Sequence, residues 1–279
     1  MLSMTTDFQS SEGCPRGALE AIARAGFSHV HWCHHWNDDF LYGRAEIEQI
    51  AAWFKEYRLA LRDLHASAGK EKNWISLRPH ERQAGVELVV NRMEMAARLG
   101  SDVIILHAQL PDSENEPFQA HWRAAATSLD ELLPAARRCG VRIAIENGRC
   151  ELVARLLDAH GPDFLGLCYD CGHGNIEGAA GLDWLDKLKG RLISVHLHDN
   201  DGRADQHRIP FTGTVDWPRL AGLIARSAYR KGVNCEATMA NDGIADPAQW
   251  LAQAHQACDK FQRMIDSFVA LYRNMSSLT

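Results

Sequence analysis

The feature of this sequence that most constrains its fold is a repeated alternation of segments. A short apolar run is followed by a polar loop and then by a segment with helical periodicity, and eight such units fill the 279 residues. This alternation is typical of parallel strands joined by crossover helices. Eight units in a chain of this length match the size of a closed barrel. We therefore predict an α/β fold, a single (β/α)8 TIM barrel whose one domain spans residues 1–279.

The expected elements can be placed along the chain. The predicted strands comprise residues 2–5, 28–32, 59–64, 102–106, 141–145, 164–169, 192–197 and 233–235. The predicted helices comprise residues 15–25, 45–57, 79–99, 118–139, 151–159, 182–189, 217–226 and 247–272. Two of these helices stop before Gly100 and Gly140, and glycine commonly follows the last turn of a helix. The rival architecture is an open doubly wound sheet, which usually carries a Gly-rich phosphate-binding turn after its first strand; this sequence has none.

The composition argues against several classes of protein. Residues 1–17 contain neither a basic start nor an apolar run, so we expect no secretory signal. No stretch approaches the roughly 20 apolar residues that span a bilayer, so we expect no membrane partner. Eight cysteines without an export signal predict reduced thiols and a cytoplasmic location. Thirty Lys and Arg against 36 Asp and Glu give a formal charge of −6, which argues against nucleic acid, because its phosphates are bound by a basic face.

The third to eighth predicted strands each end on a side chain that can bind a metal ion. In order, these are His65, His107, Glu146, Asp170, His196 and Glu236. The C-terminal strand ends of an α/β barrel meet in one cup, which holds the active site. One such residue alone is more often a hydrogen-bonded structural group. Three carboxylates and several imidazoles in one cup, however, need a cation between them, so the pattern predicts a divalent metal site. Mixed carboxylate and imidazole ligands suit Mn, Co, Zn or Fe(II) better than Ca.

Three further polar residues lie close to these strand ends in the sequence. His173 follows Asp170 by three positions, and Asp205 and His207 form a pair in the loop after the seventh predicted strand. They form either a second coordination centre or a set of contacts to substrate. The simpler alternative is that a polar loop carries them for solubility.

Two other local patterns lie in or near the expected cup. Residues 31–36, HWCHHW, concentrate aromatic and histidine side chains after the second predicted strand. This loop is either a hydrophobic plug at the barrel rim or a wall on which substrate stacks. Cys168 and Cys171 form one C-x-x-C pair around Asp170. Without a second pair, this spacing predicts neither a zinc site nor a redox motif, and we expect Cys168 to pack in the barrel wall.

At these residues the sequence resembles the xylose-isomerase-like TIM-barrel superfamily. That superfamily contains sugar and sugar-phosphate isomerases and epimerases, and also the apurinic-site endonucleases. The resemblance extends from about residue 29 to residue 236. Its strongest motifs are IEN (145–147), YDCGHGNIE (169–177), HLHDN (196–200), the Asp205 and His207 pair, GTVDW (213–217) and CEA (235–237).

Resemblance to the ketose 3-epimerase branch implies one metal ion and two catalytic glutamates. The implied metal ligands are Glu146, Asp170, His196 and Glu236. The same two glutamates form the acid/base pair of that branch. The D-x-x-H-x-N-I-E arrangement at 170–177 is similar to that branch in particular, where its histidine, here His173, contacts substrate. Apart from this resemblance, we expect a set of six residues to bind substrate, namely His31, Trp32, Trp36, His65, His107 and His198.

Resemblance to the endonuclease family implies a three-zinc cluster instead. Its nine ligands match His65, His107, Glu146, Asp170, His173, His196, Asp205, His207 and Glu236. The additional metal ligands would then be His65, His107, His173, Asp205 and His207. The chain departs from that family in showing HLHDN where the family shows HLNDS. The acidic and aromatic insertion around residues 31–43 also does not resemble a DNA-bending loop.

Two functions follow from these residues. We expect a metal-dependent isomerase or epimerase of carbohydrate metabolism, with Mn, Co, Mg or Zn as cofactor. Its substrate would be a small sugar, a sugar phosphate or a related polyhydroxy carbonyl compound, converted through an enediolate by Glu146 and Glu236. A dehydratase would use the same enolate chemistry. The alternative is a multi-zinc phosphodiesterase that resembles the apurinic-site endonucleases.

A third interpretation is a non-catalytic barrel that binds a small molecule. The intact set of candidate ligands and acid/base residues disfavours it. The sequence leaves open the substrate, its phosphorylation, the metal, and whether the chain forms a homo-oligomer.

Overall fold

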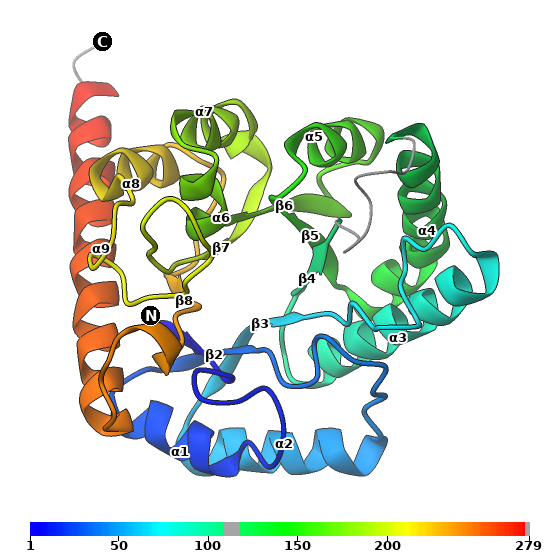
Figure 1. The fold of residues 1–279 in the computed structure, drawn as a ribbon, viewed down its shortest axis with the longest axis horizontal. Coiled ribbons are helices and arrows are strands. Elements are labelled where there is room, and N and C mark those ends of the chain that lie inside the picture. The colour runs from blue at the N-terminus through cyan, green and yellow to red at the C-terminus, as the bar shows by residue number, and fades with distance from the viewer. Residues whose placement is uncertain (109–117, 277–279) are drawn as a thin grey trace.

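The computed structural model describes residues 1–108 and 118–276, and these form a ring of eight parallel strands (Figure 1). The strands are β1 (Ser3–Thr5), β2 (His29–Trp32), β3 (Ala60–His65), β4 (Val103–His107), β5 (Arg142–Glu146), β6 (Leu165–Asp170), β7 (Leu192–His196) and β8 (Asn234–Cys235). Their order in the sheet is β7-β6-β5-β4-β3-β2-β1-β8. Each strand thus neighbours the next along the chain, which confirms the predicted (β/α)8 barrel.

The ring closes between β7 and β8 through a short seam rather than a full ladder. Leu197, just after β7, pairs with Cys235 in an isolated parallel bridge. The amide of Leu197 donates to the carbonyl of Asn234 at 2.9 Å, and the amide of Glu236 donates to the carbonyl of Leu197 at 3.0 Å. These bonds place His196 and Glu236 on adjoining strand ends.

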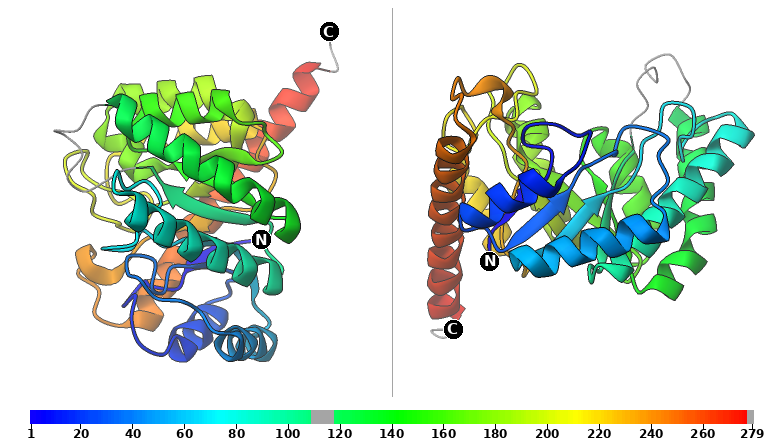
Figure 2. Two further views of the ribbon diagram at one scale, coloured as in Figure 1. Left: turned by 90° about the vertical axis from the view of Figure 1, so that its right-hand side faces the viewer. Right: turned by 90° about the horizontal axis from the view of Figure 1, so that it is seen from below.

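Helices cover the outside of the ring, apart from the short helix that directly follows β6 and lies at the end of the strands (Figures 1 and 2). They are α1 (Arg16–Arg24), α2 (Arg44–Tyr57), α3 (Pro79–Arg98), α4 (Phe118–Cys139), α5 (Cys150–Ala159), α6 (Cys171–Ile176), α7 (Ala179–Leu188), α8 (Trp217–Ala225) and α9 (Pro247–Ser276), with 3-10 turns at Lys189–Arg191 and Met239–Asn241. The short α6 was not predicted, because the six residues CGHGNI have no apolar periodicity. No helix in the described residues combines the length and apolar character needed to cross a bilayer.

Alternation along the strands separates an apolar floor from the polar cup. Successive side chains of a strand face opposite sides of the sheet. In β4, Ile104 packs into the core beneath the helices, whereas its neighbours face the barrel interior. The interior cluster comprises Val103, Ile105, Ala144 and Cys168. The same alternation turns His107, the last residue of β4, toward the interior above this floor. Cys168 therefore packs in the barrel, as the sequence predicts.

Candidate metal and active site

The six predicted ligands gather at the C-terminal ends of the strands. Five are the last residues of β3 to β7 and one follows β8: His65, His107, Glu146, Asp170, His196 and Glu236. All of them except His107 are buried. Removing this many ionisable groups from water is costly unless they pair with one another or with a cation.

Glu146 lies among four imidazole rings. Its Oε2 atom is 3.4 Å from His65 Nε2 and 3.6 Å from His107 Nε2. Its Oε1 atom is 3.4 Å from Nδ1 of both His173 and His196. These contacts are longer than the usual N–H···O bond of about 2.7–3.2 Å. They are close to the separation of about 3.4 Å between nitrogen and oxygen ligands of one tetrahedral ion with bonds of about 2.1 Å.

His196 connects Glu146 to Glu236. Its Nδ1 atom is 2.9 Å from Glu236 Oε2 and 3.4 Å from Glu146 Oε1. Burial lowers the pKa of this imidazole, but Cys168 and the two glutamates raise it, and the net pKa lies well above its ordinary value. Burial raises the pKa of Glu146, but His107 and His196 lower it, and the net pKa lies well below its ordinary value. The cluster therefore attracts positive charge, as protons or as a metal cation.

Asp170 is fixed by the residues around it. The Asn147 side chain accepts a hydrogen bond from the Asp170 amide at 2.6 Å and donates one to the Asp170 carbonyl at 2.9 Å. Oδ1 of Asp170 accepts from the His173 amide at 2.7 Å and so caps α6, while Oδ2 lies 3.0 Å from His198 Nε2. A β carbon at Gly172 would lie 1.9 Å from His198 Cε1, so only glycine lets this ring reach the carboxylate.

A second polar group lies nearer the surface. Asp205 Oδ2 is 3.1 Å from His207 Nε2 and 3.3 Å from His173 Nε2. His207 Nδ1 donates to the carbonyl of Glu236 at 2.8 Å, and its ring stacks on His198 with centroids 3.9 Å apart. His207 has a φ of 46°, a left-handed conformation that is uncommon outside glycine. These contacts hold Asp205 and His207 beside the main cluster.

Several buried polar atoms in the cup make no hydrogen bond within residues 1–108 and 118–276. They are Nε2 of His31, Oε2 of Glu146, both ring nitrogens of His196 and Nδ1 of His198. Such atoms are rare in folded proteins because each costs free energy. The side-chain groups whose donor atoms could share an ion include His65 with His107 and Glu146, and His173 with Asp205 and His207. The donor set therefore fits a divalent cation.

The tryptophans at the end of β2 and in the loop after it lie in different places, the wall and the cup. Trp36 lies against His65 and His107, with ring centroids 4.8 and 5.7 Å apart. Trp32 is only 1% exposed, donates to the Tyr42 hydroxyl at 2.9 Å and packs on an aromatic ring of α2. The structure thus places Trp36 with the predicted ligands and Trp32 in the wall outside the ring.

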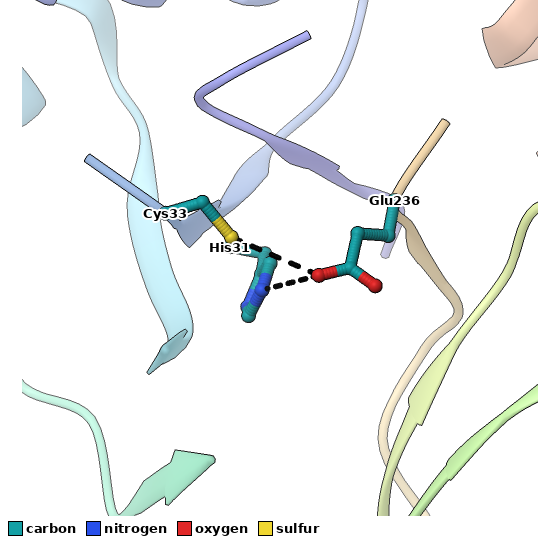
Figure 3. A group of neighbouring side chains, drawn as sticks. All are labelled: His31, Cys33 and Glu236. Atoms are coloured by element: carbon teal, nitrogen blue, oxygen red, sulfur yellow. Dashed lines mark hydrogen bonds and ion pairs between the residues drawn. The ribbon is translucent and has the colours of Figure 1, made fainter. Parts of the chain in front are cut away.

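A buried polar layer beneath the cup was missed by the sequence reasoning. Asp63 of β3 accepts hydrogen bonds from three side chains, those of His31, Ser194 and Asn234. Burial raises the pKa of Asp63, but the hydrogen bond from His31 lowers it, and the net pKa lies below its ordinary value. His31 Nε2 lies 3.3 Å from Glu236 Oε1 (Figure 3). The signal that could have revealed this layer in the sequence is the charged residue Asp63, which stands two positions before His65 and so on the same face of the strand.

Comparison with known sequences agrees with this architecture. Residues 19–256 match the family model described as xylose isomerase-like TIM barrel. The protein y4fM of Sinorhizobium fredii is 30% identical over 284 aligned positions, which cover 90% of each chain. A protein named probable endonuclease 4 from Mycobacterium bovis is 29% identical over 170 positions, which cover 57% of this chain and 65% of that relative.

Solved structures share the fold at low sequence identity. A D-tagatose 3-epimerase-like protein aligns with a TM-score of 0.78 and 19% identity, covering 96% of this chain and 99% of the other. A D-psicose 3-epimerase crystallised in the presence of D-fructose aligns with a TM-score of 0.77 and 19% identity, covering 95% and 99%. The match to the family model spans most of the sequence, and the chain therefore belongs to the xylose isomerase-like TIM barrel family.

Proposed function

We propose that this chain is a divalent-metal-dependent isomerase or epimerase of a small sugar, sugar phosphate or related polyhydroxy carbonyl compound. The observation that carries the proposal is the placement of Glu146 and Glu236, which approach the same nitrogen of His196 from different strands at 3.4 and 2.9 Å. Moving a proton at one carbon needs a base and an acid around a single buried position. The fold relatives named as 3-epimerases support this chemistry.

The donor set that would hold the cation consists of Glu146, Asp170, His196 and Glu236. When bound, the cation supplies Lewis acidity and orients the carbonyl and neighbouring hydroxyl oxygens of the substrate. Three carboxylates and one imidazole are compatible with Mn, Co, Mg or Zn.

The side chains of the cup divide the proton transfer between them. Glu146 takes the proton from the carbon beside the carbonyl, which gives an enediolate. Glu236 returns a proton on the opposite face, so the centre inverts, and the roles exchange in the reverse direction. His173, which is partly exposed and 3.4 Å from Glu146, would exchange its Nε2 contact with Asp205 for a hydrogen bond to the oxygen that gains negative charge.

The other predicted substrate-binding residues take different places in this proposal. Trp36 and His107 are partly exposed at the rim and, with His65, form the wall along which the carbon chain lies. His31 and His198 are fully buried, so in this proposal they do not contact substrate. His31 orients Glu236 and His198 orients Asp170 instead.

A multi-zinc phosphodiesterase is the second candidate. The observation that favours it is the contact of Asp205 with both His173 and His207, which completes the nine-residue pattern at one end of the barrel. The relative named probable endonuclease 4 supports the same interpretation. The formal charge of −6 opposes it, because binding to a phosphate backbone relies on basic side chains.

The deciding test is proton exchange with solvent. Protein stripped with a chelator and then reloaded with Mn, Co, Mg or Zn would be incubated in D2O with a panel of ketoses and ketose phosphates, and deuterium beside the carbonyl would be followed by NMR. We expect exchange that requires the metal. Cleavage of abasic-site DNA without exchange in any ketose would contradict the proposal and support the phosphodiesterase.

A further inference from the structure

Three side chains at the meeting of β2 and β8 form a compact group (Figure 3). His31 lies in β2, Cys33 follows that strand and Glu236 follows β8. They are 0%, 1% and 7% exposed, respectively. One donor atom of each lies within 4.8 Å of the other two. The group therefore offers one nitrogen, one sulfur and one oxygen ligand in a space shielded from water.

The separations in this group resemble those of ligands around one ion. His31 Nε2 is 3.3 Å and Cys33 Sγ is 3.8 Å from the same Glu236 oxygen, Oε1. In a tetrahedral site, bonds of about 2.1 Å to nitrogen and oxygen and about 2.3 Å to sulfur put nitrogen and oxygen about 3.4 Å apart and sulfur and oxygen about 3.6 Å apart. The nitrogen–oxygen separation matches this geometry, and the sulfur–oxygen separation is slightly longer.

His31 has the orientation that a metal-binding imidazole needs. Its Nδ1–H donates to Asp63 Oδ1 at 2.8 Å, and Asp63 is itself held by Ser194 and Asn234. Its Nε2 is buried and faces Glu236 Oε1 at 3.3 Å without meeting hydrogen-bond geometry. A carboxylate that fixes the ring through its other nitrogen is the usual support of a metal-binding histidine.

Glu236 presents its two oxygens to different groups. Oε1 faces His31 and Cys33, whereas Oε2 is 2.9 Å from His196 Nδ1 in the proposed active site. Oε1 can therefore serve this group while Oε2 stays with the active site. The active-site set is rich in oxygen, but the group around Oε1 includes a thiol, which favours zinc or cobalt over magnesium or manganese.

We propose that His31, Cys33 and Glu236 bind a second divalent cation of the zinc and cobalt class through Nε2, Sγ and Oε1, which leaves Oε2 of Glu236 to the active site. On binding, Cys33 Sγ and His31 Nε2 release their protons to solvent, and the thiolate and the neutral imidazole become the ligands. Three protein ligands leave one position of a tetrahedral ion open. The inference shares Glu236 with the proposed function but does not depend on which reaction is catalysed.

The test uses cobalt(II) as a spectroscopic probe of thiolate ligation. Chelator-stripped protein is titrated with cobalt(II), and we expect a thiolate-to-cobalt charge-transfer band in the near ultraviolet. Cys33→Ser should abolish the band and lower the bound cobalt by one ion per chain. Cys168→Ser is the matched control and should keep the band. Cys168 is the buried thiol that groups with Glu146 and His196, so a band lost in this variant would come from that group and would overturn the inference.

Two further variants test the site without changing Cys33, and they decide the question when the Cys33→Ser protein does not fold. His31→Gln leaves the thiol in place and should weaken cobalt binding at this site at least tenfold. Asp63→Asn should weaken it by about 10- to 100-fold, the usual effect of losing the support of a metal-binding histidine. Circular dichroism establishes that each variant is folded.

The outcomes separate this inference from the proposed function. Absence of the band in wild-type protein saturated with cobalt would overturn the second site, as would a band that survives Cys33→Ser or full cobalt affinity in His31→Gln. A band without ketose exchange would uphold the second site and overturn the epimerase. Exchange without a band would do the reverse.

Discussion

The two halves of the cup surround their glutamates in different ways. Glu146 contacts four imidazoles directly, and two of these rings, His107 and His173, are partly exposed. Glu236 is slightly more exposed, 7% against 2%, and follows β8, where His31 connects it to the buried carboxylate of Asp63. The comparison teaches that one residue type at equivalent strand ends can be held by different neighbours, a ring of imidazoles for Glu146 and a buried His–Asp pair for Glu236.

The largest expected effect comes from removing either carboxylate. Glu146→Gln and Glu236→Gln should each lower net epimerisation by about 10³-fold, within the usual range for losing a general acid or base. If the two act on opposite faces, residual deuterium exchange should survive from one epimer in the first variant and from the other epimer in the second. Equal residual exchange from both epimers would break the comparison. Glu151→Gln, an exposed carboxylate in the first turn of α5, is the control.

The next effect tests how much Asp63 stabilises the side of the cup around Glu236. Asp63→Ala leaves the buried donors of His31, Ser194 and Asn234 without their acceptor, so it should lower the free energy of unfolding by about 3 kcal/mol. Urea denaturation at constant metal concentration measures it. Asp183→Ala is the control, because it removes only an exposed ion pair with Arg219 and should change little. Equal losses in the two variants would show that the buried layer gives no special support.

A smaller effect is expected beside Asp170. In Gly172→Ala the new methyl group meets the His198 ring, which must move away from the Asp170 carboxylate. Such overpacking should cost about 2 kcal/mol of stability and weaken metal binding. Thermal unfolding and metal titration measure the two effects. Gly190→Ala is the control because a β carbon there meets no atom of the described residues within 4 Å. A fully stable Gly172→Ala protein would mean that His198 is free to shift.

The smallest effect concerns the side of the cup around Glu146, where Trp36 lies. Trp36→Ala removes a ring that packs on His65 and His107 at the rim, so KM should rise about tenfold with little change in kcat, as expected when only uniform binding is lost. Trp184→Ala on the outer helix α7 should leave KM unchanged. A fall in kcat with constant KM would place Trp36 in the chemical step rather than in substrate binding.

The sequence predicted the strand ends well because two local patterns determine them, the apolar run of the strand and the alternation of its side chains. Apolar runs mark the strands, and the last residue of each run reaches the cup by alternation, as for His107 and Glu146. The ligand set could therefore be proposed before any coordinates. The roles of the individual ligands remain predictions, since they depend on metal and substrate.

Other parts of the site depend on contacts that no local pattern contains. His31 faces Asp63 only because the register between β2 and β3 shifts after Val30. Cys33 lies outside the strand, and its approach to Glu236 follows the path of a loop held by tertiary contacts. Trp32 and Trp36 look equivalent in the sequence, yet they lie on different sides of the barrel wall.

The short seam between β7 and β8 has a mechanical consequence. Few backbone hydrogen bonds join these strands, and the contact of His196 with Glu236 crosses the gap just above them. A cation bound between these two side chains would therefore hold β7 and β8 together. Loading the cup with cations should slow amide hydrogen exchange at Leu197 and Glu236 more than on the opposite side of the ring. The same charges that serve the chemistry would then keep the barrel from opening where its backbone is weakest.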